Sequence, residues 1–272
     1  MSGYIVGGIE VPISMYPYIA VITKEHRAHC GGVIISKRVV LSAAHCTISP
    51  MGNYHPPDKF DIYLGSSRFM EGARYKVCEL SPHEKYSAES HLYDISTFLL
   101  TQNIIFGPLV QKAIIAPDER WKKTKYTMTV AGFGVTETEG GLTRTLRSTR
   151  MRYVDAKTCN GSQYGMYKMI VPDHMFCMIG EGWTSDCFGD SGSAITWRKY
   201  LVGLVATGRD ASCGSDVMPS MYTNVVFLKD WVESRVKNLE ASTEGGCRSR
   251  GKRRGRTNNY NMDKFSTDYY RD

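Results

Sequence analysis

Short runs of β-branched and apolar residues, separated by turn-forming residues, place the strongest constraint on the fold of this chain. Glycine, proline, serine and asparagine stand between the runs, and these residue types favour tight turns. The runs predicted to form strands are residues 18–23, 32–36, 38–42, 61–65, 126–130 and 200–206. One further stretch, residues 227–239, has apolar residues at helical spacing. The pattern predicts an all-β domain that ends in one helix.

The chain is long enough for one large β domain or for two small barrels that share a cleft. It has 272 residues, and 42% of them are hydrophobic, so a sizeable core can be buried. Its longest apolar runs, such as residues 201–206, are far shorter than a membrane crossing requires. No membrane-spanning segment is therefore expected.

Positive charge is concentrated at the carboxyl-terminal end. Of the formal net charge of +7, most comes from residues 248–272, where eight Lys or Arg stand against three Asp. A segment with so few apolar residues cannot offset the entropy lost on ordering, so residues 241–272 are expected to form a basic, disordered tail. Two readings of this tail stay open: contact with a polyanion, or a solvated extension, which is favoured.

The cysteines are even in number and dispersed along the chain. They lack the paired C-x-x-C spacing of a zinc site, so no metal is expected. Dispersed, even-numbered cysteines favour disulfides and an oxidising compartment, although spacing alone does not assign the pairs. The eight are Cys30, Cys46, Cys78, Cys159, Cys177, Cys187, Cys213 and Cys247.

Three short stretches carry residues suited to nucleophilic catalysis. His45 ends one apolar run, Asp94 opens another, and Ser191 stands within a Gly-Asp-Ser-Gly string. Taken singly, each has an ordinary structural reading, as a core or surface histidine, a turn aspartate and a tight glycine turn. Their joint presence in this order favours catalysis over those readings.

The chemistry of acyl transfer asks for these three side chains. A serine hydroxyl is a poor nucleophile until a base removes its proton, and an imidazole that titrates near neutral pH can take that proton and later return it. An aspartate buried against the imidazole would fix its tautomer and stabilise the imidazolium. We therefore interpret Ser191 as nucleophile, His45 as general base and Asp94 as the orienting acid.

These stretches resemble the trypsin/chymotrypsin family in residue type, order and separation. Ile-Val-Gly-Gly at residues 5–8 matches the mature amino terminus of that family, and residues 131–134 and 175–177 resemble two of its internal motifs. The resemblance runs from Ile5 to about residue 236. It implies two six-stranded antiparallel β-barrels with the active site in the cleft between them, plus a carboxyl-terminal α-helix.

The resemblance also implies a function. Residues 5–240 would form a secreted, extracellular serine endopeptidase domain that hydrolyses polypeptide substrates through an acyl-enzyme on Ser191 and needs no cofactor. Macromolecular inhibitors would be natural partners. The backbone N–H groups of Gly189 and Ser191 would form the oxyanion hole. No signal peptide is visible before the domain.

Activation would follow the family pattern of a zymogen. Cleavage between Tyr4 and Ile5 would free an α-amino group that pairs with Asp190, and this ion pair would shape the oxyanion hole. Residues 1–4 would then be a short propeptide or a truncated leader. Tyr4 departs from the Arg or Lys usual before that cut, which implies an unusual activator or a different natural propeptide.

Disulfide pairs are likewise suggested by the resemblance. They are Cys30–Cys46, Cys159–Cys177 and Cys187–Cys213. Cys78 and Cys247 remain, and three alternatives stay open for them: a mutual disulfide by elimination, two free thiols, or a bond to another chain.

The specificity pocket departs from both main patterns of the family. Ser185 lies six residues before Ser191, as in chymotrypsin-like pockets, but Asp186 follows it directly. A carboxylate inside the pocket would favour a cationic side chain. Gly208 and Ser220 match the positions of the pocket walls. We expect a basic or mixed P1 preference, with large apolar side chains as the alternative if Asp186 points away.

Two further departures lie close to the catalytic residues. Ala-Thr-Gly at residues 206–208 replaces the family's Ser-Trp-Gly, which removes a hydroxyl expected to hydrogen-bond the Asp94 carboxylate. Ser-Ala at residues 193–194 replaces Gly-Pro. Neither change touches a reacting group, so activity is still expected. The rival hypotheses are a non-catalytic secreted homologue that acts as a binding protein, and a polyanion-binding protein that carries a vestigial protease.

Overall fold

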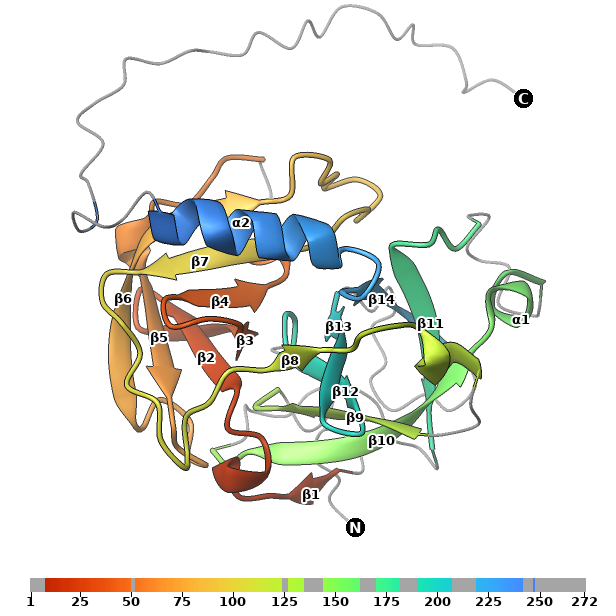
Figure 1. Ribbon diagram of the computed structural model, residues 1–272, viewed down its shortest axis with the longest axis horizontal. Coiled ribbons are helices and arrows are strands. Elements are labelled where there is room, and N and C mark those ends of the chain that lie inside the picture. Colours follow the sequence, from red (N-terminus) through yellow and green to blue (C-terminus); the bar gives the residue numbers. More distant parts are fainter. Residues whose placement is uncertain are drawn as a thin grey trace, which may run out of the picture.

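The computed structural model describes residues 8–49, 52–123, 127–134, 144–161, 170–181, 190–206, 219–241 and 247. Two β-barrels lie side by side, and a carboxyl-terminal helix crosses the first of them beside β7 (Figure 1). In the described part of the chain, no helix combines the length and the apolarity that a membrane crossing requires.

The first barrel is closed and has six antiparallel strands in the order β2-β3-β4-β7-β6-β5. The strands are β2 (Ile19–Lys24), β3 (Arg27–Ile34), β4 (Val39–Ser42), β5 (Phe60–Leu64), β6 (Ala73–Pro82) and β7 (Ser96–Leu100). Fully buried side chains such as Ile22, Ile62 and Phe98 fill its interior. Each large apolar side chain removed from water in this way contributes about 1.5–3 kcal/mol.

The second barrel also closes through six antiparallel strands. They are β9 (Thr127–Gly132), β10 (Arg147–Val154), β11 (Met175–Gly180), β12 (Ala194–Trp197), β13 (Tyr200–Val205) and β14 (Ser220–Asn224). The ring closes because β9 pairs with both β10 and β12. Two short strands add to it from outside: β1 (Ile9–Glu10) pairs with β10, and β8 (Ile114–Ile115) runs parallel to β13. The prediction of two six-stranded barrels is confirmed.

The helices are few and short apart from the last one. The 3₁₀ turns are η1 (Ile13–Met15), η2 (Ala44–Thr47), η3 (Pro57–Lys59) and η4 (Arg120–Lys123), and the α-helices are α1 (Ala156–Gly161) and α2 (Lys229–Ala241). Although α2 follows the second barrel in sequence, it packs on the first, where Leu239 is buried with Val39 and Leu99. It begins two residues after the start of the predicted stretch, residues 227–239.

Disulfides tie several of these elements together. The structure contains Cys30–Cys46 and Cys159–Cys177, and it joins Cys78 on β6 to Cys247 beyond α2. The last bond links cysteines 169 residues apart and anchors Cys247, which follows α2, to the first barrel. Cys187 and Cys213 lie outside the described residues, as does the basic segment 248–272.

Candidate active site

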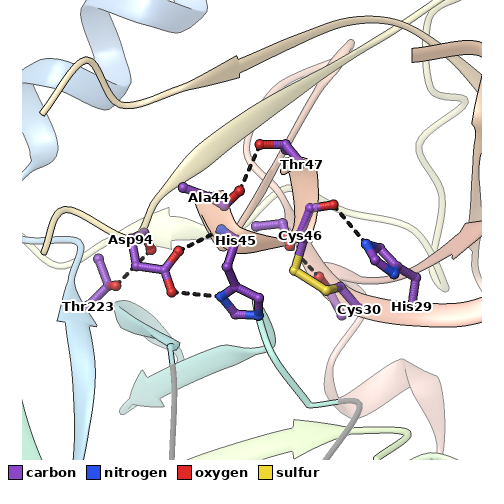
Figure 2. Close-up of polar contacts among 10 residues, drawn as sticks. His29, Cys30, Ala44, His45, Cys46, Thr47, Asp94 and Thr223 are labelled. Atoms are coloured by element: carbon purple, nitrogen blue, oxygen red, sulfur yellow. Dashed lines mark hydrogen bonds and ion pairs between the residues drawn. A yellow bond between two sulfur atoms is a disulfide. The ribbon is translucent and has the colours of Figure 1, made fainter. Parts of the chain in front are cut away.

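His45 lies on the short turn η2, which begins just after strand β4 ends. Figure 2 shows His45 beside its turn neighbours Ala44 and Thr47. The hydroxyl of Thr47 donates to the carbonyl oxygen of Ala44 at 2.7 Å and closes this turn. The neighbouring Cys46 is bonded to Cys30 on β3. A strand end, a closed turn and a disulfide therefore hold the imidazole in place.

Asp94 holds His45 at two points. It lies two residues before β7, and its carboxylate is fully buried. One carboxylate oxygen accepts the backbone N–H of His45 at 2.9 Å, and the other lies 2.8 Å from the ring atom Nδ1 (Figure 2). Because a carboxylate can only accept, Nδ1 must carry the hydrogen. Nε2 of the neutral ring is then free to accept a proton.

Asp94 also sets the basicity of the imidazole. Burial alone would lower the pKa of His45, but the charge of Asp94 and its hydrogen bond outweigh that effect and hold the pKa above its ordinary value. A quarter of the His45 side chain remains exposed, so the ring is accessible from one side. These are the properties of a general base.

A second histidine lies close by but is engaged differently. His29 on β3 donates its Nε2 hydrogen to the carbonyl oxygen of Cys46 at 2.7 Å. Burial lowers the pKa of His29 to about 4. Among the described residues no carboxylate contacts His29, and its Nε2 is hydrogen-bonded to the backbone, so nothing there orients the ring as a base.

Ser191 lies in a tight turn that packs against the strand end before His45. The N–H of Ser193 donates to the carbonyl oxygen of Asp190 at 2.8 Å, which closes a four-residue turn around Ser191 and Gly192. Gly192 has φ of +81°, the left-handed conformation that type II turns require at this position. A Cβ on Gly192 would overlap Ser42 Oγ, so this glycine also permits the close approach of the two barrels.

The turn is joined to the first barrel by one hydrogen bond, and a second bond within that barrel holds the donor strand. The N–H of Gly31 donates to the carbonyl oxygen of Ser191 at 2.8 Å, and the hydroxyl of Ser42 donates to the carbonyl oxygen of Gly31 at 2.7 Å. Within the described residues, no hydrogen bond joins the Ser191 hydroxyl to His45. The structure thus forms the His–Asp pair directly and places the serine turn beside it, and such nucleophile–base contacts are often loose in ligand-free enzymes.

Comparison with known proteins decides the family. The trypsin family model matches residues 5–232. The chain belongs to the trypsin family. Its relatives include trypsin theta of Drosophila melanogaster, 30% identical over 242 residues with 88% of each chain covered. Trypsin 5G1 of Aedes aegypti is 28% identical over 235 residues, with 85% of each chain covered.

Two further comparisons agree. The vitellin-degrading protease of Bombyx mori is 28% identical to this trypsin-family chain over 236 residues, with 86% of each chain covered. The solved structure of neuropsin, described as a serine protease expressed in the limbic system of mouse brain, superposes with a TM-score of 0.74 at 23% identity and covers 85% of this chain and 99% of its own. That likeness supports the fold, and the sequence relatives support a trypsin-like serine endopeptidase.

The aspartate that would receive the new amino terminus of this trypsin-family protein is in a buried position. Asp190 is fully buried, and one of its carboxylate oxygens accepts the backbone N–H of Gly134 at 2.9 Å. A Cβ on Gly134 would overlap that carboxylate, which explains a glycine there. Ile5, the predicted partner, lies outside the described residues.

Most of the predicted specificity pocket of this trypsin-like protein lies outside the described residues. Ser220 is described, and it begins β14, half-buried and paired with Met178 of β11. The roles predicted for the other pocket and oxyanion residues stay predictions. They are Ser185, Asp186, Gly189 and Gly208.

Sequence reasoning missed two groups around Asp94. Thr223 on β14 donates its hydroxyl hydrogen to the backbone carbonyl oxygen of Asp94 at 2.8 Å (Figure 2). Tyr93, which precedes Asp94, is sandwiched between the rings of two histidines. No local pattern could have pointed to either, because the partners are distant in sequence.

One cluster near the site has the residue types of a metal centre. Ligand atoms of Cys30, His45 and Cys46 lie within 4.8 Å of one another. The two sulfur atoms are bonded to each other, so they do not offer the thiolates that a zinc site requires.

Proposed function

We propose that this trypsin-family protein is a secreted endopeptidase that hydrolyses peptide bonds through an acyl-enzyme on Ser191. The proposal depends on the two contacts between Asp94 and His45, which lie beside the Ser191 turn. The Asp94 carboxylate accepts the backbone N–H of His45 at 2.9 Å and lies 2.8 Å from its ring atom Nδ1. This arrangement leaves Nε2 as the base and keeps it oriented. Neither a binding module nor a vestigial protease needs such an arrangement.

The proposed reaction has two halves. In the first, the Ser191 hydroxyl attacks the scissile carbonyl carbon while His45 takes its proton, and His45 then gives that proton to the departing amine. In the second, water attacks the acyl-enzyme, again through His45, and frees the new carboxylate and the Ser191 hydroxyl. Asp94 stays ionised and stabilises the imidazolium in both halves. The N–H groups of Gly189 and Ser191 would bind the oxyanion.

Activation is proposed to follow cleavage before Ile5. The new α-amino group would then pair with Asp190, whose carboxylate is fully buried and lies at the start of the Ser191 turn. Because a buried carboxylate is expensive without a compensating charge, this pairing would hold the turn in its working shape. The activating protease is expected to tolerate Tyr4 before the cut.

The preferred substrate is proposed to carry a basic or mixed P1 residue. Ser185 would form the floor of the pocket, Asp186 would supply a carboxylate, and Gly208 and Ser220 would line its walls. Secretion is supported by the disulfides of the described part. Polyanion contact through residues 248–272 and binding of macromolecular inhibitors stay predictions.

A single protein preparation tests the catalytic proposal. The chain is cut before Ile5 through an engineered cleavage site, exposed to a fluorophosphonate probe and profiled on a peptide library. We expect Ser191 to be labelled and peptides to be cleaved, and Ser191→Ala to lose both. An intact, correctly cut protein that neither reacts with the probe nor cleaves any peptide would instead establish the non-catalytic homologue.

A further inference from the structure

The ring of Tyr93 is packed between two histidine rings. On one side the centroid of His83 lies 4.6 Å away at an interplanar angle of 24°, and on the other the centroid of His174 lies 3.8 Å away at 9°. Trp231 continues the row, with its ring centroid 4.8 Å from that of His83. The proposed reaction does not use this row of four rings.

The row joins parts of the molecule that are far apart in sequence. His83 follows β6 in the first barrel, His174 immediately precedes β11 in the second, and Trp231 lies in α2. Both histidines are themselves held by the backbone. The backbone N–H of His83 donates to the carbonyl oxygen of Ile95 at 2.9 Å. The backbone N–H of Asn224 donates to the carbonyl oxygen of His174, also at 2.9 Å. The Tyr93 ring therefore sits in a slot whose two walls are fixed by separate barrels.

The backbone at Tyr93 needs such support. Its φ is +53°, in the left-handed region that L-residues with bulky side chains rarely adopt. The N–H of Ile95 donates to the carbonyl oxygen of Tyr93 at 2.7 Å, which closes a three-residue turn centred on Asp94. The direction in which Asp94 leaves the backbone depends on this turn.

The orientation of the Asp94 carboxylate relies on few hydrogen bonds. Within the described residues, its hydrogen bonds are the two that it accepts from His45. These bonds tie the carboxylate to the η2 turn, but they do not set the direction in which the Asp94 side chain leaves its own backbone. That orientation must come from the backbone on either side of the carboxylate, where Thr223 holds the carbonyl oxygen of Asp94 itself.

We propose that Tyr93 is a positioning residue, and that its sandwich between His83 and His174 locks the turn that aims the Asp94 carboxylate at His45. The inference deepens the proposed function and rests on it. The ring does this by stacking and not through its hydroxyl, because the Tyr93 hydroxyl makes no hydrogen bond within the described part of the structure.

Two substitutions at position 93 separate the ring from the backbone. Tyr93→Gly accepts the left-handed conformation but removes the ring, whereas Tyr93→Phe restores the ring. In the protein cut before Ile5, we expect Tyr93→Gly to lower kcat by about 10- to 100-fold with little change in KM. The acid limb of its kcat/KM profile should move to lower pH, because a misplaced Asp94 no longer raises the pKa of His45. Tyr93→Phe should restore both.

His174→Leu supplies a second test that leaves Tyr93 in place. It removes one wall of the slot, so it should move kcat and the acid limb in the same direction as Tyr93→Gly. Thermal unfolding of each variant verifies that it is folded at the assay temperature. The proposal is overturned if folded Tyr93→Gly and His174→Leu keep the wild-type kcat and acid limb, or if Tyr93→Phe is as damaged as Tyr93→Gly.

A readout without turnover keeps this inference separate from the proposed function. Proton NMR in the Ser191→Ala background follows the titration of the His45 ring. A lower His45 pKa in Tyr93→Gly supports positioning even if the wild-type protein cleaves no peptide, and in that case the proposed function alone fails. An unchanged pKa overturns the positioning role whatever the activity of the wild type.

Discussion

Thr223, on the last strand of the second barrel, donates its hydroxyl hydrogen to the backbone carbonyl oxygen of Asp94 at 2.8 Å, across 129 residues of sequence. Both residues are almost fully buried. Asp94 belongs to the first barrel, so this hydrogen bond fixes it relative to the barrel that carries Ser191. The site is thus assembled at the junction of two separately closed sheets.

Removing the Thr223 hydroxyl should weaken both activity and stability. Thr223→Val keeps the shape of the side chain but leaves the Asp94 carbonyl oxygen without this donor. We expect the free energy of unfolding to fall by about 1–3 kcal/mol, the usual penalty for an unsatisfied buried group. Denaturant unfolding and kcat measure the two effects. Thr223→Ser, which keeps the hydroxyl, should stay close to wild type, and an equal loss in both variants would argue against the hydrogen bond.

Gly192 should be far more sensitive to substitution than another glycine of the same conformation. Gly192 has φ of +81° and Gly52 has φ of +78°, so alanine is strained at both positions, by roughly 1–2 kcal/mol. A Cβ at Gly52 would meet nothing within 4 Å, whereas at Gly192 it would overlap Ser42 Oγ. Gly192→Ala should therefore displace the Ser191 turn.

The two alanine variants are compared in one peptide-cleavage assay and one unfolding experiment. Gly52→Ala is expected to keep wild-type kcat/KM, while Gly192→Ala loses on the order of 100-fold because the nucleophile is misplaced. Similar activities in the two variants would mean that the close approach of the turn to β4 does not matter for catalysis.

Six of the twelve barrel strands that the structure describes were predicted, because their signal is local. β-branched runs bounded by turn residues marked β2, β4, β5 and β13 to within a residue or two. The predicted run 32–36 covers only the end of β3, which begins at Arg27. The polar start of β3 is a strand because it pairs with β2, where Lys24 lies opposite Arg27, and that register is not written in either segment alone.

The candidate site was predictable only in part, for a similar reason. Motif order and resemblance pointed to His45, Asp94 and Ser191, since the residue types themselves carry the chemistry. The contacts around Asp94 were not predictable: Thr223 donates to its backbone carbonyl oxygen, and His83 and His174 stack on the neighbouring Tyr93. These contacts arise from barrel closure and strand register. The short helix α1 was also missed, because six residues give too little periodicity to detect.

Replacing Asp94, the proposed orienting acid, should change the pH dependence as well as the rate. Asp94 raises the pKa of His45 against the opposing effect of burial. Activity requires the neutral imidazole, so it is lost as pH falls through that raised pKa. In Asp94→Asn the charge is gone, the pKa of His45 should fall, and the acid limb of kcat/KM should move to lower pH.

The expected loss of kcat in Asp94→Asn is on the order of 10⁴-fold, the loss caused by the equivalent change in the chymotrypsin-type triad. A peptide-substrate pH–rate profile measures both effects. An acid limb that stays in place would show that Asp94 does not set the pKa of His45.

Asp61 should make the stability of the first barrel sensitive to acid. Its buried carboxylate lies 2.7 Å from Arg74 and 2.8 Å from Lys76 on the neighbouring strand. Burial alone would raise the pKa of Asp61, but the hydrogen bonds and charges of these two cations lower it below its ordinary value. The charged carboxylate is therefore favoured by folding. Its contribution is present above the pKa of the unfolded carboxyl group, about 3.9, and is lost as pH falls through the lower folded value.

Asp61→Asn should accordingly lower the free energy of unfolding at pH 7 by about 1–3 kcal/mol, because a buried polar contact to two cations is weakened. The difference from wild type should shrink as both proteins are unfolded at progressively lower pH, below about pH 4. Asp58→Asn is the matched control. Asp58 is exposed and makes no ion pair within the described residues, so its replacement should change stability by less than about 0.5 kcal/mol. A difference between Asp61→Asn and wild type that stays constant with pH would show that packing, and not charge, accounts for the role of Asp61.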